Sequence, residues 1–128
     1  MITFGLNEQD ARLYFIDMIK ALEYCHNTIK VIHRDIKPEN IMINHNNEAV
    51  LIDFGVSAIV EHQENDDELT SKMGSYMFFA PEMFESSTST KKVRGRKTDL
   101  WALGITLYYM LCGQYPYESA KNQFEIRN

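Results

Sequence analysis

The chain has 128 residues, which is enough for one domain with a single core. Hydrophobic residues make up 45% and charged residues 24%, the balance of an ordinary soluble globular protein. Its 18 acidic residues outnumber 13 basic ones, for a net charge of −5, and this balance argues against non-specific binding to nucleic acid.

The N-terminal segment predicts an amphipathic helix that starts after Asn7 and ends before Val31. Asn7 with Asp10 three residues later is typical of a helix cap, and Asp10 also suits the positive end of the helix dipole. Apolar residues at three- or four-residue spacing predict one buried face, and they are Ala11, Phe15, Met18, Leu22 and Cys25.

From Val31 the pattern changes to short apolar runs that are too brief for helices. The runs at 41–43 and 49–52 flank a polar turn, and together they predict a β-hairpin. A polar loop, residues 33–40, lies between the first run and this hairpin. Such a loop in an apolar neighbourhood is a favourable place for chemistry.

Residues 60–72 are predicted to be a loop-like connection and residues 85–97 an exposed connection, with a short helix starting at Pro81 between them. The second connection contains a basic cluster, which consists of Lys91, Lys92, Arg94, Arg96 and Lys97. Such a cluster could dock an acidic partner, but a solvated loop is the preferred interpretation.

Residues 98–112 predict a helix that is apolar on nearly every face, so we expect it at the centre of the core. Gly113 follows as a C-cap, and a final polar helix is expected from about Glu118. We identify no second domain. The predicted fold class is therefore mainly α with a small β-hairpin (α+β).

The two cysteines, Cys25 and Cys112, are far apart, so we expect neither a disulfide scaffold nor a cysteine zinc site. This usage favours a reducing, cytoplasmic setting. The N-terminus lacks the features of a signal peptide, and the longest mostly apolar stretch is too short to span a bilayer. We therefore expect no membrane partner and no nucleic-acid partner.

The polar loop carries the strongest motif. It reads H-R-D-x-K-x-x-N, and three further motifs follow it in the order D-F-G (53–55), A-P-E (80–82) and D-x-W-x-x-G (99–104). With these motifs the chain resembles the protein kinase family, and Lys37 two residues after Asp35 resembles its Ser/Thr-specific branch. The resemblance covers nearly the whole chain. It implies that residues 1–128 are a partial kinase domain from the C-terminal large lobe of a kinase-like fold.

The resemblance also implies roles for residues of the catalytic loop, as we call residues 33–40. Asp35 would be the catalytic base, Lys37 would meet the γ-phosphate of ATP, and Asn40 and Asp53 would hold Mg²⁺. Their chemistry suits these roles, because a carboxylate can accept a proton and because amide and carboxylate oxygens bind Mg²⁺. Gly55 is expected to permit a turn that aims Asp53 inward. Nucleotide contacts are implied for Lys37, Glu39, Asn40, Met42 and Asp53.

Regulation is predicted in the segment between Phe54 and Ala80, which we call the activation segment. By resemblance, Ser71 is the site of an activating phosphate and Thr70 is the neighbouring candidate. Arg34 is a guanidinium that could bind such a phosphate bidentately. Ser75 is expected to pack on the catalytic loop where the peptide substrate binds.

Two functions stay open at this stage. The first is a Ser/Thr protein kinase with a protein substrate and an upstream activating kinase. It would look most like the calcium/calmodulin-dependent kinase kinases, which act on other kinases. The second is a non-catalytic module that binds substrates or partners. These 128 residues contain neither G-x-G-x-x-G nor A-x-K, so we expect the small lobe and the last helices of the large lobe to be absent from them and the isolated chain to be inactive.

Overall fold

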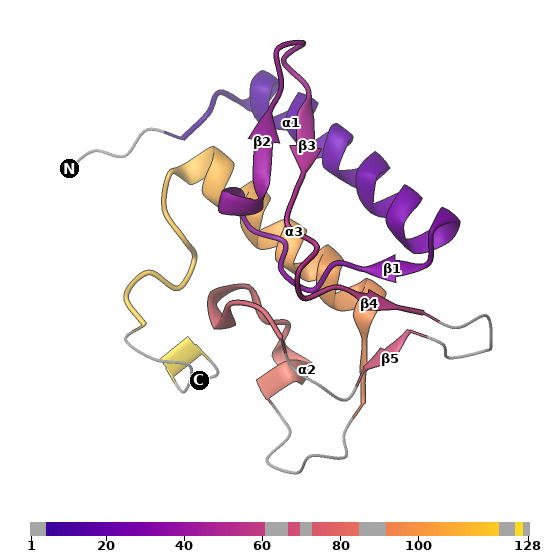
Figure 1. Ribbon diagram of the computed structural model, residues 1–128. Coiled ribbons are helices and arrows are strands. Elements are labelled where there is room, and N and C mark those ends of the chain that lie inside the picture. The colour runs from indigo at the N-terminus through magenta and orange to yellow at the C-terminus, as the bar shows by residue number, and fades with distance from the viewer. Residues whose placement is uncertain (1–4, 61–66, 70–72, 85–91, 121–124, 127–128) are drawn as a thin grey trace.

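The computed structural model describes residues 5–60, 67–69, 73–84, 92–120 and 125–126. Two long helices, α1 and α3, pack against each other and carry the short strands on one side (Figure 1). The helices are α1 (Glu8–Glu23), α2 (Pro81–Phe84) and α3 (Gly95–Cys112), and the strands are β1 (Val31–Ile32), β2 (Ile41–Ile43), β3 (Ala49–Leu51), β4 (Ala58–Ile59), β5 (Glu68–Leu69) and β6 (Val93–Arg94). No helix among these residues combines the length and the apolar character needed to cross a bilayer.

Helix α1 confirms the predicted cap. The side chain of Asn7 accepts a hydrogen bond from the backbone N–H of Asp10 at 2.9 Å, so one of the unpaired amides of the first turn is satisfied. The helix ends in a π-helical turn over Tyr24–Thr28. The predicted stripe faces the core, where Ala11, Met18, Leu22 and Cys25 are buried and Phe15 is half-buried.

The strands form three antiparallel pairs, of which only the second was predicted as a hairpin. Strand β1 pairs with β4, β2 with β3, and β5 with β6. In the hairpin Met42 lies opposite Val50, as the polar turn requires. The other two pairs join segments that are far apart in sequence, which local patterns do not reveal.

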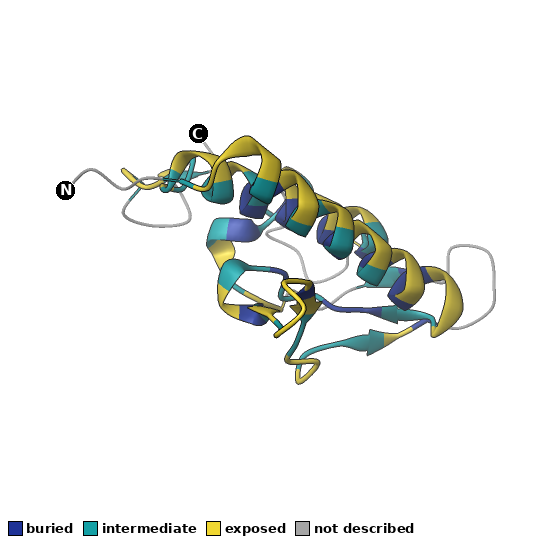
Figure 2. Ribbon diagram, turned by 90° about the horizontal axis from the view of Figure 1, so that it is seen from above, coloured by how far each residue is buried: buried dark blue, intermediate teal, exposed yellow. Residues whose placement is uncertain are grey.

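The main core lies between α1, α3 and the hairpin. Met18 and Leu22 of α1 meet Leu103 of α3, and Ile36 of the catalytic loop joins them. Buried residues concentrate on one side of the long helices, and the opposite side is exposed (Figure 2). Ile36 therefore anchors the catalytic loop to the main core.

Three predictions for the second half are wrong. Helix α3 starts at Gly95 instead of Thr98, and residues 93–95 are buried or half-buried instead of being an exposed connection. The helix is also not buried all round, because its described surroundings leave Leu100 49% and Leu111 41% exposed. Residues 116–119 form turns and residues 125–126 are helical, and because residues 121–124 lie outside the described residues, the final helix expected from about Glu118 stays a prediction.

Candidate active site

The catalytic loop and the D-F-G segment lie side by side because two strand pairs hold them. The loop connects β1 to β2, and β1 pairs with β4, which follows the D-F-G segment. The backbone N–H of Ile52 donates to the carbonyl of Asn40 at 2.9 Å. Residues 33–40 and 52–57 are thus brought together from separate parts of the sequence.

Asp35 and Lys37 form an ion pair at the surface of this loop. The ammonium Nζ of Lys37 lies 3.2 Å from Oδ2 of Asp35 and 3.2 Å from the hydroxyl of Ser75. The Asp35 side chain is 15% exposed and that of Lys37 is 24% exposed, so the pair is partly shielded from water. The contact with Ser75 agrees with the expectation that this hydroxyl packs on the catalytic loop.

Asn40 is buried and holds Asp35 in place. Its amide nitrogen donates to the backbone carbonyl of Asp35 at 2.8 Å and to Oδ2 of the same residue at 3.0 Å. Within the part of the chain that the structure describes, no hydrogen bond reaches the amide oxygen. Both N–H groups of the amide are used in the hydrogen bonds to Asp35, and the amide oxygen remains as an acceptor that a ligand could use.

Asp53 is exposed and adopts a φ of 60°. One of its carboxylate oxygens accepts the backbone N–H of Gly55 at 3.2 Å. The expected turn is therefore made at Asp53, and Gly55 is not in the left-handed region. The prediction that Gly55 aims Asp53 inward is wrong, because the short polar side chain of Asp53 supports the left-handed conformation itself.

His33 joins the catalytic loop to the D-F-G segment from inside. Its Nδ1 accepts the backbone N–H of Asp35 at 3.2 Å, and its Nε2 lies 2.9 Å from the carbonyl of Ile52. This network assigns the neutral tautomer with the proton on Nε2, since Nδ1 must accept. The ring also packs edge-on against Phe54 with centroids 4.8 Å apart.

Asp99 anchors the catalytic loop to α3 and is almost fully buried. Its carboxylate accepts the backbone N–H groups of His33 and Arg34, each at 2.9 Å. The same carboxylate lies 2.8 Å from Nε2 of His26. Burial and this nearby charge raise the pKa of the Cys25 thiol.

The contact of His26 with Asp99 was not predicted from the sequence. His26 directly follows Cys25 and lies four residues after Leu22, so its place on the buried side of α1 was the available signal. The distant partner on α3 could not be read from the sequence.

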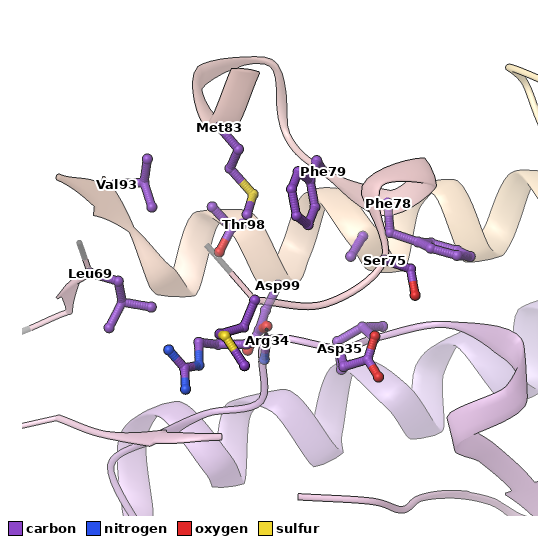
Figure 3. A pocket seen from close by; sticks show the side chains of 13 residues that line it. Arg34, Asp35, Leu69, Ser75, Phe78, Phe79, Met83, Val93, Thr98 and Asp99 are labelled. Carbon is purple, nitrogen blue, oxygen red and sulfur yellow. Dashed lines mark hydrogen bonds between the residues drawn. The ribbon is translucent and has the colours of Figure 1, made fainter. Parts of the chain in front are cut away.

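The activation segment approaches the catalytic loop at Gly74. A Cβ at Gly74 would lie 2.3 Å from the carbonyl oxygen of Arg34, and Gly74 has a φ of 97°. Arg34 donates from Nε to the carbonyl of Val56 in the D-F-G segment. In Figure 3 Arg34 extends toward the side of Leu69, whereas Asp35 extends toward the side of Ser75. Thr70 and Ser71 lie outside the described residues.

Arg34, Asp35 and Ser75 line one side of a pocket between the catalytic loop and α3, with Phe78 and Met83 among the apolar residues of its lining (Figure 3). None of the predicted nucleotide contacts lines this pocket; they are Lys37, Glu39, Asn40, Met42 and Asp53. Glu39 is exposed, and Met42 on β2 is 58% exposed. Asp35, Lys37, Asn40 and Ser75 therefore form the compact part of the site.

Residues 2–128 match the family model described as the protein kinase domain, and the chain belongs to this family. It is 37% identical over 122 residues to sperm motility kinase 2B of Mus musculus, covering 95% of this chain and 24% of that protein.

Two further relatives are serine/threonine-protein kinases by name. Serine/threonine-protein kinase ssp1 of Schizosaccharomyces pombe is 38% identical over 125 residues, which cover 94% of this chain and 19% of that protein. Probable serine/threonine-protein kinase MARK-C of Dictyostelium discoideum is 37% identical over 121 residues, which cover 94% of this chain and 14% of that protein. The chain thus spans a quarter or less of the length of these relatives.

Proposed function

We propose that the protein containing these residues is a Ser/Thr protein kinase that transfers the γ-phosphoryl group of ATP to a protein hydroxyl. The observation that carries this proposal is the grouping of Lys37 and Asn40 around one carboxylate oxygen of Asp35, at 3.2 and 3.0 Å. Membership of the protein kinase family supports it. Phosphoryl transfer depends mainly on positioning and on charge stabilisation, and this group supplies both.

Asp35 is proposed as the catalytic base. Asn40 and Lys37 both bind Oδ2, and no hydrogen bond from the described residues reaches Oδ1. Oδ1 is therefore free to orient the acceptor hydroxyl and take its proton. A positioned base of this kind contributes about 10²–10⁴ in rate.

The residues fit a nucleotide with Mg²⁺. The amide oxygen of Asn40 and the exposed carboxylate of Asp53 would hold the metal ion, which generally takes one or two carboxylates and completes its coordination with phosphates and water. The described residues contain no cluster of three or more His, Cys, Asp or Glu side chains, so the phosphates of ATP would supply further ligands. When bound, Mg²⁺ neutralises charge on the phosphates. Lys37 would meet the γ-phosphate, and Glu39 and Met42 would contact the nucleotide.

We also propose the finer features of the resemblance. Residues 1–128 would be part of the large lobe, and they would be inactive in isolation because the G-x-G-x-x-G and A-x-K motifs are not among them. The protein would act in the cytoplasm. Its substrates would be other kinases, as for the calcium/calmodulin-dependent kinase kinases, which the run from Asp53 to Ser57 resembles.

Phosphorylation of Ser71, or of its neighbour Thr70, by an upstream kinase would order the activation segment through Arg34. The test compares Ser71→Ala with wild type in the protein expressed from its complete reading frame. The Ala variant should resist activation by an upstream kinase. Unchanged activation would contradict a role for Ser71.

The main test is a transfer assay with the same complete protein. With γ-labelled ATP, Mg²⁺ and a kinase-derived acceptor, we expect label on Ser or Thr and none when Mg²⁺ is chelated. The control variant Glu23→Gln should transfer label as wild type does, because Glu23 is an exposed carboxylate on α1. If the protein binds the acceptor but transfers no label, the proposal fails and the non-catalytic binding module replaces it.

A further inference from the structure

Asp67 lies in the activation segment but reaches the start of α3. Strand β5, which follows Asp67, pairs with β6, which leads directly into α3. In this register Glu68 lies opposite Arg94, and Leu69 lies opposite Val93. The arm of the activation segment that leads to Thr70 and Ser71 is thus fastened to the entry of the central helix.

The carboxylate of Asp67 caps this helix from a distant part of the sequence. Arg94, the residue at the N-cap position of α3, makes no capping hydrogen bond with its own side chain. Instead Oδ2 of Asp67 accepts the backbone N–H of Arg96 at 3.3 Å, and the carbonyl of Asp67 accepts that of Gly95 at 2.8 Å. Two amides of the first turn are thereby satisfied, and a negative charge lies at the positive end of the helix dipole.

An ion pair reinforces this cap. Nη1 of Arg94 donates to Oδ1 of Asp67 at 2.9 Å, and Asp67 is only 6% exposed. Burial raises the pKa of Asp67. This effect of burial is outweighed by the hydrogen bonds from the Arg94 side chain and the Arg96 backbone and by the charges of both arginines. Together they hold the pKa of Asp67 below its usual value. The carboxylate is therefore charged at neutral pH.

Packing leaves little freedom where these elements meet. A Cβ at Gly95 would lie 2.9 Å from side-chain atoms of Ile32 on β1 and of Leu69 on β5. The first turn of α3 is therefore in close contact with the strand before the catalytic loop and with the activation segment. Asp99, in the same N-terminal part of α3, binds the backbone of His33 and Arg34.

We propose that Asp67 is a positioning residue, which holds the first turn of α3 and, through Asp99, keeps the catalytic loop aligned with the activation segment. It is not among the residues that line the pocket beside Asp35, and it acts through the helix. Its effect on turnover rests on the proposed kinase function, whereas its effect on the structure does not.

The test compares three variants of the complete protein. Asp67→Ala removes the cap and the ion pair, whereas Asp67→Asn keeps an oxygen that can accept the helix amide but loses the charge. Glu23→Gln is the control, because Glu23 is an exposed carboxylate on α1 and, unlike Glu68, does not pair with Arg94. Amide hydrogen exchange and steady-state kinetics are measured for each.

In Asp67→Ala we expect exchange at residues 95–99 and at His33 and Arg34 to accelerate about tenfold, while α1 keeps its protection. The turnover number should fall while the KM for ATP stays within about twofold of wild type. Asp67→Asn should lie between wild type and Asp67→Ala, and Glu23→Gln should match wild type.

Unchanged exchange at 95–99 in Asp67→Ala would overturn the proposal, and so would equal acceleration throughout the chain. If Asp67→Ala does not fold, Asp67→Asn decides: faster exchange at 95–99 with α1 protected supports the proposal, and wild-type exchange there overturns it. Because exchange is read without turnover, an inactive wild-type protein would count against the kinase proposal alone.

Discussion

Replacing Gly74 by alanine tests how closely the activation segment must approach the catalytic loop. The added Cβ would lie 2.3 Å from the carbonyl oxygen of Arg34, at a φ of 97° that L-residues rarely adopt. Left-handed backbone costs about 1–2 kcal/mol for a residue with a Cβ. The overlap adds to this cost because a backbone atom cannot move aside as a flexible side chain can. We expect Gly74→Ala to lower the free energy of unfolding by about 2 kcal/mol or more.

Gly104→Ala is the matched control for this substitution. Gly104 lies within α3, and a Cβ there would meet no described atom within 4 Å beyond the adjacent helix backbone. Alanine is favoured over glycine in a helix by about 0.5–1 kcal/mol, so this variant should be more stable than wild type. Urea unfolding of the 128-residue chain measures both changes.

Kinetics on the complete protein should show the same difference between the two glycines. Gly74→Ala should move Ser75 away from Lys37 and raise the KM for the acceptor more than the KM for ATP. Equal stability and equal kinetics of the two variants would refute the reasoning, because then no close approach at Gly74 would be needed.

Three further predictions concern titratable groups that are buried or half-buried. Asp99→Ala should destabilise the chain by about 3 kcal/mol or more, measured by urea unfolding, because the buried groups that Asp99 binds lose their charged acceptor. The pKa of Asp67 is lower in the folded state than its ordinary value of 3.8. The ionised carboxylate therefore stabilises the fold above pH 3.8, and this stabilisation is lost as the pH falls through the lower pKa of the folded state. The stability difference between wild type and Asp67→Asn should therefore vanish in acid. Burial raises the pKa of Tyr115 from 10.0 to about 12, so its stabilisation is present below pH 10.0 and is lost as the pH rises to about 12. Tyr115→Phe should abolish that alkaline loss, which urea unfolding across the alkaline pH range measures.

The local parts of the fold could be predicted from the sequence. The cap at Asn7, the stripe of α1 and the hairpin between 41–43 and 49–51 depend on neighbours within a few residues, and the structure confirms each. Gly113 also ends α3 with the expected left-handed φ, here 69°. The catalytic loop could be located because its motif is contiguous.

The long-range partners could not be predicted. His26 meets Asp99 across 73 positions, and Asp67 meets Arg94 across 27, so no periodicity or spacing in the sequence connects them. The segment 92–97 appeared exposed because its charges are dense. In the structure two of these charges are paired with the acidic residues before Thr70, which turns an apparent loop into strand β6 and the start of α3.

The most direct test of the central claim separates nucleotide binding from phosphoryl transfer in Asp35→Asn. This variant keeps an oxygen that can accept from Lys37 and Asn40 but cannot take a proton from the acceptor. In the complete protein we predict MgATP binding within about twofold of wild type by calorimetry, together with a turnover number lower by about 10²–10⁴. Wild-type turnover in Asp35→Asn would contradict the role of Asp35 as the base and, with it, the proposed mechanism.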